Sequence, residues 1–191
     1  MAAVLERHDM SFERLSLGSC DSMSSAPPMS QQLHQLNDKW VLYHHLPSEK
    51  DWTLAGYKIL DKNISTVEHV TALINILPEK MIKYSMMFFM RDGITPLWED
   101  PKNRTGGCFS YKVFNKHVEQ VWKDMMCLVS GESIVVDSVD CKCVNGITIS
   151  PKKNFCIIKI WICDMEHQDP KIVNYVENLT RHGSVFKTHD G

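Results

Sequence analysis

At the centre of the chain stands the apolar run Met86-Met87-Phe88-Phe89-Met90. A short run of this kind, bounded by turn residues, is typical of a strand that is buried on both faces. Methionine suits such a position because its flexible side chain fills irregular gaps in a core. The run therefore predicts a central strand over residues 84–91.

Seven further runs are rich in β-branched and aromatic residues or alternate between apolar and polar side chains, as half-buried strands do. They cover residues 39–45, 57–60, 108–113, 133–137, 146–149, 155–163 and 185–189. The short gaps between several of them are of hairpin length. Eight strands are therefore predicted beyond residue 34.

Three segments combine the apolar spacing of a helix with start and stop signals. They cover residues 66–77, 115–129 and 169–183. The first opens on a Ser65 or Thr66 cap, the second ends before Gly131, and the third has Pro170 at its first helical position. Helices between pairs of strands favour an α+β fold, in which an antiparallel sheet carries helices on one face and leaves the other open to a ligand.

Composition limits the domain organisation and the function. Residues 1–33 are rich in Ser, Met, Gln and Pro without a sustained period, which predicts a flexible tail before a folded domain at 34–191. The 21 Lys and Arg residues against 23 Asp and Glu residues give a formal net charge of −2. No overall basic field therefore attracts long nucleic acid, and any such contact must be local.

The cysteines and the hydropathy indicate the compartment. Seven cysteines without a secretory leader favour reduced thiols inside the cell, and the close pair Cys141 and Cys143 lacks a second ligand pair at zinc-site spacing. No apolar stretch approaches the roughly 20 residues that cross a bilayer. We therefore expect a cytoplasmic protein with no metal, no cofactor and no membrane contact.

Residues 93–100, with the sequence GITPLWED, place an indole beside a carboxylate on a turn. A planar cation is attracted to an aromatic face by about 0.5–1 kcal/mol when exposed, and a carboxylate accepts two parallel N–H bonds. Trp98 and Glu99 would therefore suit a flat, positively charged purine. The alternative is structural, with Trp98 as a loop anchor and Glu99-Asp100 as a turn cap.

Further motifs follow in a fixed order across nearly all of the chain from residue 34 to residue 189. They are HQLNDKW at 34–40, TVE at 66–68, GITPLWED at 93–100, NRTGG at 103–107, Trp122, GES at 131–133 and IKIW at 158–161. This set resembles the eukaryotic translation initiation factor 4E family, the messenger-RNA cap-binding proteins. The resemblance implies a single curved antiparallel sheet of about eight strands, three helices on its convex face, and a cap slot on its concave face.

The resemblance also implies roles for individual slot residues. Trp52 and Trp98 would stack on the two sides of 7-methylguanine, whose methylation makes the ring cationic. Glu99 would accept hydrogen bonds from the guanine edge, and Trp161 would lie against the N7-methyl group. Taken singly, Trp52 and Trp161 have the commoner alternative of a core or rim position.

The phosphate end departs from the family pattern. Lys152 and Lys153 fall where the family places basic side chains for the triphosphate, although a solvated lysine pair on a turn is the alternative. Cys108 and Ile157 occupy two other positions that are basic in the family. Fewer or differently placed phosphate contacts are therefore expected.

The convex face departs further. Family partners insert a short helix against a tryptophan of the first helix, and Thr71 holds that position here. Lys123 and Cys127 stand where leucines are expected. The partner-binding residues implied by the resemblance are His34, Leu36, Val67, Thr71, Trp122, Lys123, Cys127 and Gly131. Because losing an interface indole costs roughly 2 kcal/mol or more, we expect weakened or altered partner binding.

The leading interpretation is a non-enzymatic protein that binds the 7-methylguanosine cap of messenger RNA in translation initiation. Its partners would be capped RNA and a scaffold initiation factor or a 4E-binding peptide helix, and it would be a monomer outside that complex. One alternative is a cap-binding repressor that cannot recruit the scaffold; another is an interaction scaffold without cap binding. A cap-processing enzyme would need clustered carboxylates for Mg²⁺ or a Gly-rich turn in a βαβ unit, and the sequence has neither.

Overall fold

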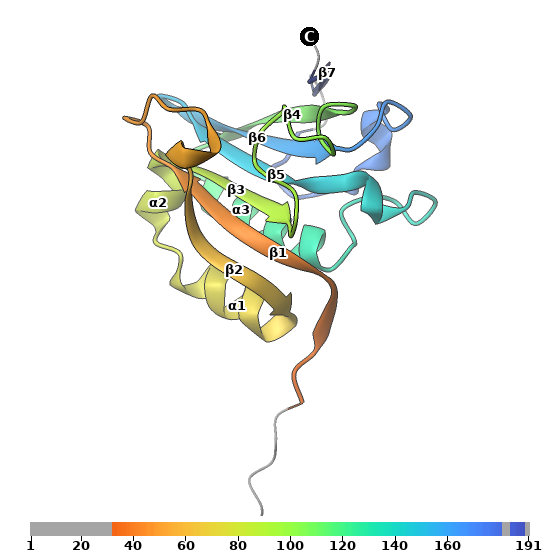
Figure 1. The fold of residues 1–191 in the computed structure, drawn as a ribbon, viewed down its shortest axis with the longest axis horizontal. Helices are drawn as coiled ribbons and strands as arrows, with labels where there is room; N and C mark the ends of the chain where they lie inside the picture. Colours follow the sequence, from red (N-terminus) through yellow and green to blue (C-terminus); the bar gives the residue numbers. More distant parts are fainter. Residues whose placement is uncertain (1–31, 181–183, 190–191) are drawn as a thin grey trace, which may run out of the picture. The chain divides into compact units, whose positions relative to one another are not determined.

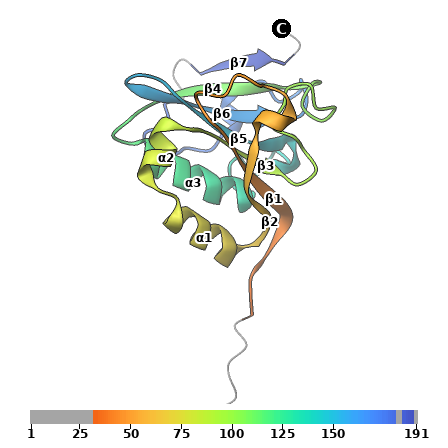
Figure 2. The same ribbon diagram turned by 60° about the vertical axis from the view of Figure 1, so that its left-hand side comes forward.

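The computed structural model describes residues 32–180 and 184–189, and its folded unit begins at Leu33. Within these residues the chain forms one curved, seven-stranded antiparallel sheet with three α-helices on one face, as Figures 1 and 2 show. The predicted α+β class is confirmed. The predicted tail, residues 1–33, lies outside the described residues except for its last two.

The sheet has the order β2-β1-β3-β5-β6-β4-β7, with every neighbouring pair antiparallel. Its strands are β1 (Gln35–His45), β2 (Lys58–Thr66), β3 (Met86–Arg91), β4 (Gly107–Phe114), β5 (Val144–Pro151), β6 (Phe155–Ile162) and β7 (Val185–Thr188). The apolar run at 86–90 forms β3, which lies between β1 and β5 as a buried inner strand. The sequence prediction for this run is confirmed.

The α-helices are α1 (Val67–Ile76), α2 (Glu79–Tyr84) and α3 (Val118–Ser130). Helix α1 begins where the sequence predicts, because the Thr66 side chain accepts a hydrogen bond from the His69 backbone N–H at 3.1 Å. Helix α3 ends before Gly131, also as predicted. The short helix α2 follows Pro78 directly and was not predicted.

Strand alternation divides the apolar side chains between two cores. On β6, Ile158 and Ile160 point to the helix side, where they join the larger core with Phe89 of β3. Trp161 and Phe88 point to the opposite side, where a smaller apolar cluster forms. The sheet face opposite the helices is thus lined with apolar and aromatic side chains that could contact a ligand.

The predicted helix over 169–183 is wrong for the residues that are described. Only a 3₁₀ turn forms, at Pro170–Ile172, and residues 181–183 lie outside the described part of the chain. The Asn174 side chain donates to the carbonyls of Ser133 and Val135, so it supports an extended segment instead. Asn178 has a φ of 62°, a left-handed conformation that a helix cannot contain. The buried positions Val173, Val176 and Leu179 have helical spacing by coincidence.

The predicted strand over 133–137 is also wrong. Its sole ladder contact is an isolated bridge between Val135 and Val173. The segment packs instead against the irregular chain at 170–179, and the Val136 N–H donates to the Ile172 carbonyl. In the described residues the sheet therefore has seven strands where about eight were expected.

Within residues 32–180 and 184–189, no helix is both long enough and apolar enough to cross a membrane. No group of three or more His, Cys, Asp or Glu side chains there is arranged to hold a metal ion.

Candidate functional site

A cavity of about 500 Å³ opens on the sheet face opposite the helices. It is lined by Trp52, Tyr57, Pro96, Leu97, Trp98, Glu99, Lys159, Trp161 and His189. These residues come from four separate parts of the chain: the β1–β2 connection, the β3–β4 connection, β6 and the end of β7. The structure therefore brings together all four residues that the sequence predicted for the slot, Trp52, Trp98, Glu99 and Trp161.

The loop that carries Trp98 is organised by Asp100. Gly93 opens the loop with a φ of 76°, which residues with a side chain rarely adopt. Asp100 accepts hydrogen bonds from the Thr95 N–H at 2.8 Å, the Thr95 hydroxyl at 2.6 Å and the Lys102 N–H at 2.9 Å. Burial alone would raise the pKa of Asp100, but the hydrogen bonds from Thr95 and Lys102 outweigh it, so the pKa is lowered.

Asn103 joins this loop to the sheet. Its fully buried side-chain amide donates to the carbonyls of Thr95 at 2.9 Å and Leu97 at 2.7 Å. Asn145 of β5 donates in turn to the Asn103 side-chain oxygen at 2.9 Å and to the Lys102 carbonyl at 2.7 Å. The polar groups of the loop are thus connected, through two side-chain amides, to the interior of the sheet.

Glu99 and Trp98 remain available to a ligand. Asp100 takes the structural role that the sequence had left open for the Glu99-Asp100 pair. The Glu99 carboxylate is exposed and has no hydrogen-bond partner among the described residues, and the Trp98 side chain is 56% exposed. Because the loop is held by hydrogen bonds to other residues, this carboxylate and this indole can bind a flat ligand without first breaking hydrogen bonds within the protein.

The opposite wall is Trp52, which rests on a histidine. The rings of His45 and Trp52 stack with centroids 4.2 Å apart and an interplanar angle of 9°. The His45 Nε2–H donates to the Asp51 carbonyl at 2.9 Å, while its buried Nδ1 has no partner among the described residues. Trp52 keeps 55% of its surface exposed.

Trp161 forms the floor of the cavity. It is only 7% exposed, and its Nε1–H donates to the Thr148 hydroxyl of β5 at 2.7 Å. The His189 ring packs against it at 4.8 Å, and the His189 Nδ1–H donates to the Asn103 carbonyl at 2.7 Å. Trp161 is therefore largely a core residue, which was the alternative to a ligand contact in the sequence analysis. It nevertheless lines the cavity.

Tyr57 lies between the two loops. Burial, and secondly the nearby Glu99 carboxylate, raise the pKa of the Tyr57 hydroxyl to about 12. Tyr57 also packs edge-on against His45 at 4.9 Å and Phe88 at 5.1 Å. Its place in the cavity could not be predicted from the sequence, because a single Tyr at the start of a strand has no distinguishing pattern.

The basic residue that lines the cavity is Lys159, which the sequence did not single out for this role. It shares a face of β6 with Trp161, two residues away. The predicted phosphate ligands Lys152 and Lys153 are exposed in the β5–β6 turn and are not among the lining residues. Both precede β6, whose residues from Phe155 to Trp161 alone span about 20 Å of strand at about 3.3 Å per residue. Their assignment stays a prediction.

The two positions at which the family resemblance implies further basic residues lie on the same face. Cys108 is buried directly across the ladder from Trp161, and Ile157 is half-buried two residues before Lys159. Burial raises the pKa of the Cys108 thiol, partly offset by the positive charges of Lys159 and Lys187. Positive charge therefore reaches this end of the cavity from β6 and β7.

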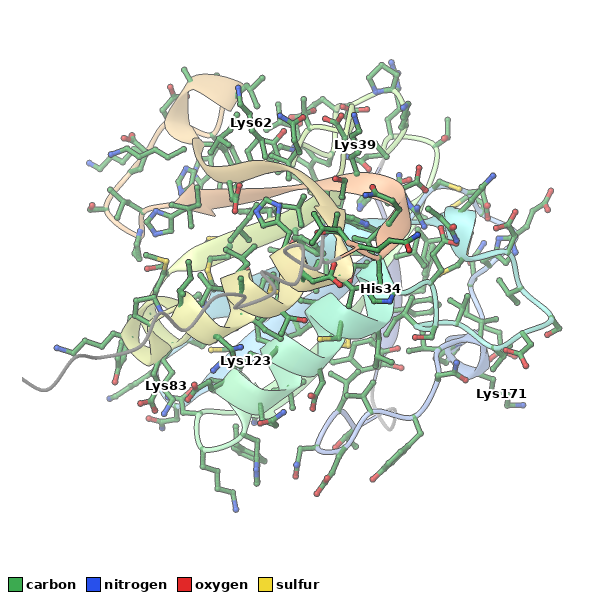
Figure 3. All side chains as sticks on the ribbon, turned by 90° about the horizontal axis from the view of Figure 1, so that it is seen from below. His34, Lys39, Lys62, Lys83, Lys123 and Lys171 are labelled. Carbon is green, nitrogen blue, oxygen red and sulfur yellow. The ribbon has the colours of Figure 1, made fainter. Side chains whose placement is uncertain are left out.

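Figure 3 views the molecule from the side that the helices cover. Val67 and Thr71 of α1 are exposed, and the Thr71 hydroxyl donates to the Val67 carbonyl at 2.9 Å. Lys123 of α3 pairs with Glu119 at 2.7 Å, close to an exposed Cys127. Polar or small groups thus occupy the positions where the family resemblance implies large apolar ones.

The remaining partner-binding candidates differ in access. His34 is exposed and its Nδ1 lies 2.6 Å from Glu68, while Leu36 is half-buried and Gly131 exposed. Trp122 is fully buried and packs in the core beneath α3. Its side chain can support this face from below, but it cannot contact a partner directly.

Residues 35–189 match the family model described as eukaryotic initiation factor 4E. Among curated relatives, a mimivirus homolog of eukaryotic translation initiation factor 4E is 43% identical over 61 residues, which is 32% of this chain and 22% of the relative. The factor 4E of Eremothecium gossypii is 32% identical over 136 residues, which is 67% of this chain and 62% of the relative. The chain thus spans less than two thirds of the length of these two relatives.

Two solved structures have a similar fold. A schistosome eIF4E complexed with m7GpppG and 4E-BP has a TM-score of 0.62 at 23% identity, covering 71% of this chain and 75% of that one. The eIF4E-3 of C. elegans, in complex with the 4E-binding protein Mextli and a cap analog, has a TM-score of 0.62 at 20% identity, covering 70% and 76%. At these identities the likeness establishes the fold alone.

Proposed function

Because the chain belongs to the eukaryotic initiation factor 4E family, we propose that its cavity binds the 7-methylguanosine cap of messenger RNA in translation initiation. The observation that carries the proposal is the meeting of Trp52, Trp98 and Glu99 around one cavity. The two indoles are each more than half exposed, on loops from different parts of the chain. An exposed aromatic pair of this kind is costly in water unless a ligand covers it.

The physical basis of selectivity is charge. Methylation at N7 makes guanine a flat cation, which is attracted to an indole face by about 2 kcal/mol or more once it is desolvated. Glu99, which has no internal hydrogen bond among the described residues, accepts from the guanine N1–H and 2-amino groups. Unmethylated guanine keeps the edge contacts and loses most of the attraction to the indoles. In this proposal Trp161 contacts the N7-methyl group from the cavity floor.

The phosphates extend toward Lys159, the lysine that lines the cavity. The strand register supports Lys187 as a second contact. Lys187 of β7 lies opposite Cys108 of β4, which in turn lies opposite Trp161 of β6. Lys152 and Lys153 are kept in the proposal as outer contacts of a longer ligand. A lysine acts as a point charge on phosphate and does not fork onto it as arginine does.

We extend the proposal to a helical peptide or scaffold factor on the helix-covered face. His34, Leu36, Val67, Thr71, Lys123, Cys127 and Gly131 would form this contact, with Trp122 supporting it from the core. Thr71 offers such a helix no large apolar surface, which favours a weaker or specialised partner. A cap-binding repressor that fails to recruit the usual scaffold is therefore the second candidate function.

The experiment is a titration of the purified chain with 7-methyl-GTP and with GTP, followed by tryptophan fluorescence. We expect strong quenching by the methylated nucleotide, little by GTP, and loss of the response in Trp52→Ala. Trp40→Phe is a matched control, because Trp40 is a fully buried indole on the helix side. Equal or absent responses to the two nucleotides would refute cap binding and leave the interaction scaffold as the function.

The repressor and the initiation factor are separated by a second assay. The purified chain is offered a peptide helix from a scaffold initiation factor, with Thr71→Trp as the comparison. Weak capture by the wild type and stronger capture by the variant would support a specialised partner face. Full-strength capture by the wild type would refute the claim that Thr71 weakens this surface.

A further inference from the structure

A second group of aromatic and basic side chains lies on the same sheet face, beyond the cavity. It consists of Lys112 and Phe114 at the end of β4 and Phe155 at the start of β6, and is called the distal patch below. The Lys112 ammonium lies 5.2 Å from the Phe114 ring centroid and 4.5 Å from that of Phe155. Phe114 is 57% exposed, although phenylalanine is among the residues most often buried in folded proteins.

The distal patch is continuous with the cavity along two paired strands. The pairs Cys108 with Trp161, Ser110 with Lys159, Lys112 with Ile157 and Phe114 with Phe155 follow one another in register. The alternating partners of these residues, such as Tyr111 and Ile158, lie in the core on the helix side. From Trp161 to Phe155 is six residues, or about 20 Å along the strand.

The charge of this end of the sheet opposes that of the whole chain. Residues 101–118 contain Lys102, Arg104, Lys112 and Lys116, and residues 144–163 contain Lys152, Lys153 and Lys159, without any Asp or Glu in either segment. The complete chain has a formal net charge of −2. Positive charge is therefore concentrated on β4, β6 and their connections, where it can attract an anionic ligand.

We propose that the distal patch binds the first nucleotides of the RNA chain that follows the cap. This inference rests on the proposed function of the cavity, because the RNA must leave the cavity along this face. Exposed Phe114 offers a ring on which a base can stack, and Lys112, Lys152 and Lys153 offer charges for phosphates. Stacking and phosphate contacts tolerate any base, so the patch would bind RNA without a sequence preference. Because the cap nucleotide alone does not reach the patch, the patch would strengthen the binding of capped RNA only.

An acidic protein segment is the other occupant that a basic and aromatic surface can accept. RNA is favoured because Lys159 continues the positive charge from the cavity to Lys112 on the same face. A polyanion that starts in the cavity meets these charges in order along its own length. An acidic protein segment would not start in the cavity, so its charges would not follow this order of lysines.

The test compares the affinities of the full chain for three probes. They are 7-methyl-GTP, an unstructured RNA of about ten nucleotides that carries the cap, and the same RNA without a cap. We expect the capped RNA to bind wild type more tightly than 7-methyl-GTP. Phe114→Ser should weaken capped-RNA binding about tenfold, the loss of roughly one stacked base, and leave 7-methyl-GTP binding unchanged.

Control variants separate this role from a structural one. Ile59→Ser removes a side chain of similar exposure, 54%, from β2 at the opposite edge of the sheet and should change none of the affinities. Phe114→Tyr keeps the ring and should retain capped-RNA binding. Lys112→Ser should reduce the slope of log affinity against log salt by about 0.7 for the RNA, whereas exposed Lys62→Ser on β2 should not.

Each outcome has a separate meaning. Equal affinities of wild type for capped RNA and 7-methyl-GTP would overturn the proposal, as would equal losses in Phe114→Ser and Ile59→Ser. If 7-methyl-GTP and GTP bind alike, cap recognition fails, and the uncapped RNA then decides. If the uncapped RNA binds wild type and binds Phe114→Ser more weakly, the proposal for the distal patch is supported. If the uncapped RNA does not bind, or binds both proteins equally well, the proposal is overturned. Binding of an acidic peptide alone would likewise overturn it.

Discussion

The two loops that present indoles to the cavity are held in different ways. The Trp98 loop is fixed by hydrogen bonds within it, which Asp100 accepts and Asn103 donates, and by a buried bond that Asn145 of the sheet donates to Asn103. The Trp52 loop is fixed mainly by the stack of Trp52 on His45 and one bond from His45 to the Asp51 carbonyl. Its other side-chain bonds stay within the loop itself: the Glu49 and Asp51 carboxylates accept them from backbone N–H groups of the same loop.

The contrast indicates a division of roles. Directional hydrogen bonds fix the position and orientation of a loop, because each buried partner left unpaired carries a large cost. A stacked pair tolerates sliding, since it is worth only about 0.5–1.5 kcal/mol beyond its buried area. We therefore expect the Trp98 side to supply the fixed wall with the specific acceptor Glu99, and the Trp52 side to supply the adjustable wall.

The largest effect is expected from Asn103→Ala. The substitution leaves the part-buried Thr95 and Leu97 carbonyls without the Asn103 donor, and it leaves the buried Asn145 amide without one acceptor. The free energy of unfolding should fall by about 3 kcal/mol. Urea denaturation measures it, with exposed Asn154→Ala as the control. A loss as small as that of the control would mean that the network does not hold the Trp98 loop.

Asp100→Asn should have a smaller effect. The carboxylate accepts three hydrogen bonds, and replacing it by a neutral amide should cost about 1.5 kcal/mol at neutral pH. Because the folded pKa of Asp100 is lowered, its contribution is complete above the unfolded pKa of about 3.9 and is lost as the pH falls through the lower folded value. The difference in stability between wild type and variant should therefore shrink below about pH 4. A difference independent of pH would contradict the assigned charge.

The sequence predicted the fold well where the local pattern and the tertiary structure agree. The run at 86–90 could only be buried, and Thr66 and Gly131 mark helix ends with chemistry that acts locally. The pattern at 169–183 was misread because the apolar spacing of Val173, Val176 and Leu179 fits a helix equally well. The Asn174 side chain instead stabilises an extended segment, because it donates to the carbonyls of Ser133 and Val135, about 40 residues away. Contacts between residues so far apart cannot be predicted from a local sequence pattern.

The site was predictable to a similar extent. Trp98 and Glu99 could be recognised because they share one turn of eight residues. Trp52, Trp98 and Trp161 meet only through the sheet order, so their common cavity had to come from the family resemblance. His45 and Lys159 were missed because their roles depend on which neighbour lies across a strand or under a ring.

His45→Phe should change stability less than either substitution in the Trp98 loop. The phenyl ring preserves the stack under Trp52 and gives up the hydrogen bond to the Asp51 carbonyl, a loss of about 1 kcal/mol. Removal of the unpartnered Nδ1 offsets part of that loss. Urea denaturation should therefore show a net change below about 1 kcal/mol. A change as large as that of Asn103→Ala would remove the distinction between the two loops.

The smallest effect tests whether the two loops sense each other without a ligand. Tyr57 follows the Trp52 loop, yet its pKa is raised to about 12 first by burial and then by Glu99 of the Trp98 loop. Glu99→Gln removes the negative charge, so the Tyr57 pKa should fall and still remain above its ordinary value. Alkaline titration of tyrosine absorbance measures it, with Tyr57→Phe identifying the signal. An unchanged pKa would mean that Glu99 lies too far away to affect Tyr57, and that the two loops do not interact without a ligand.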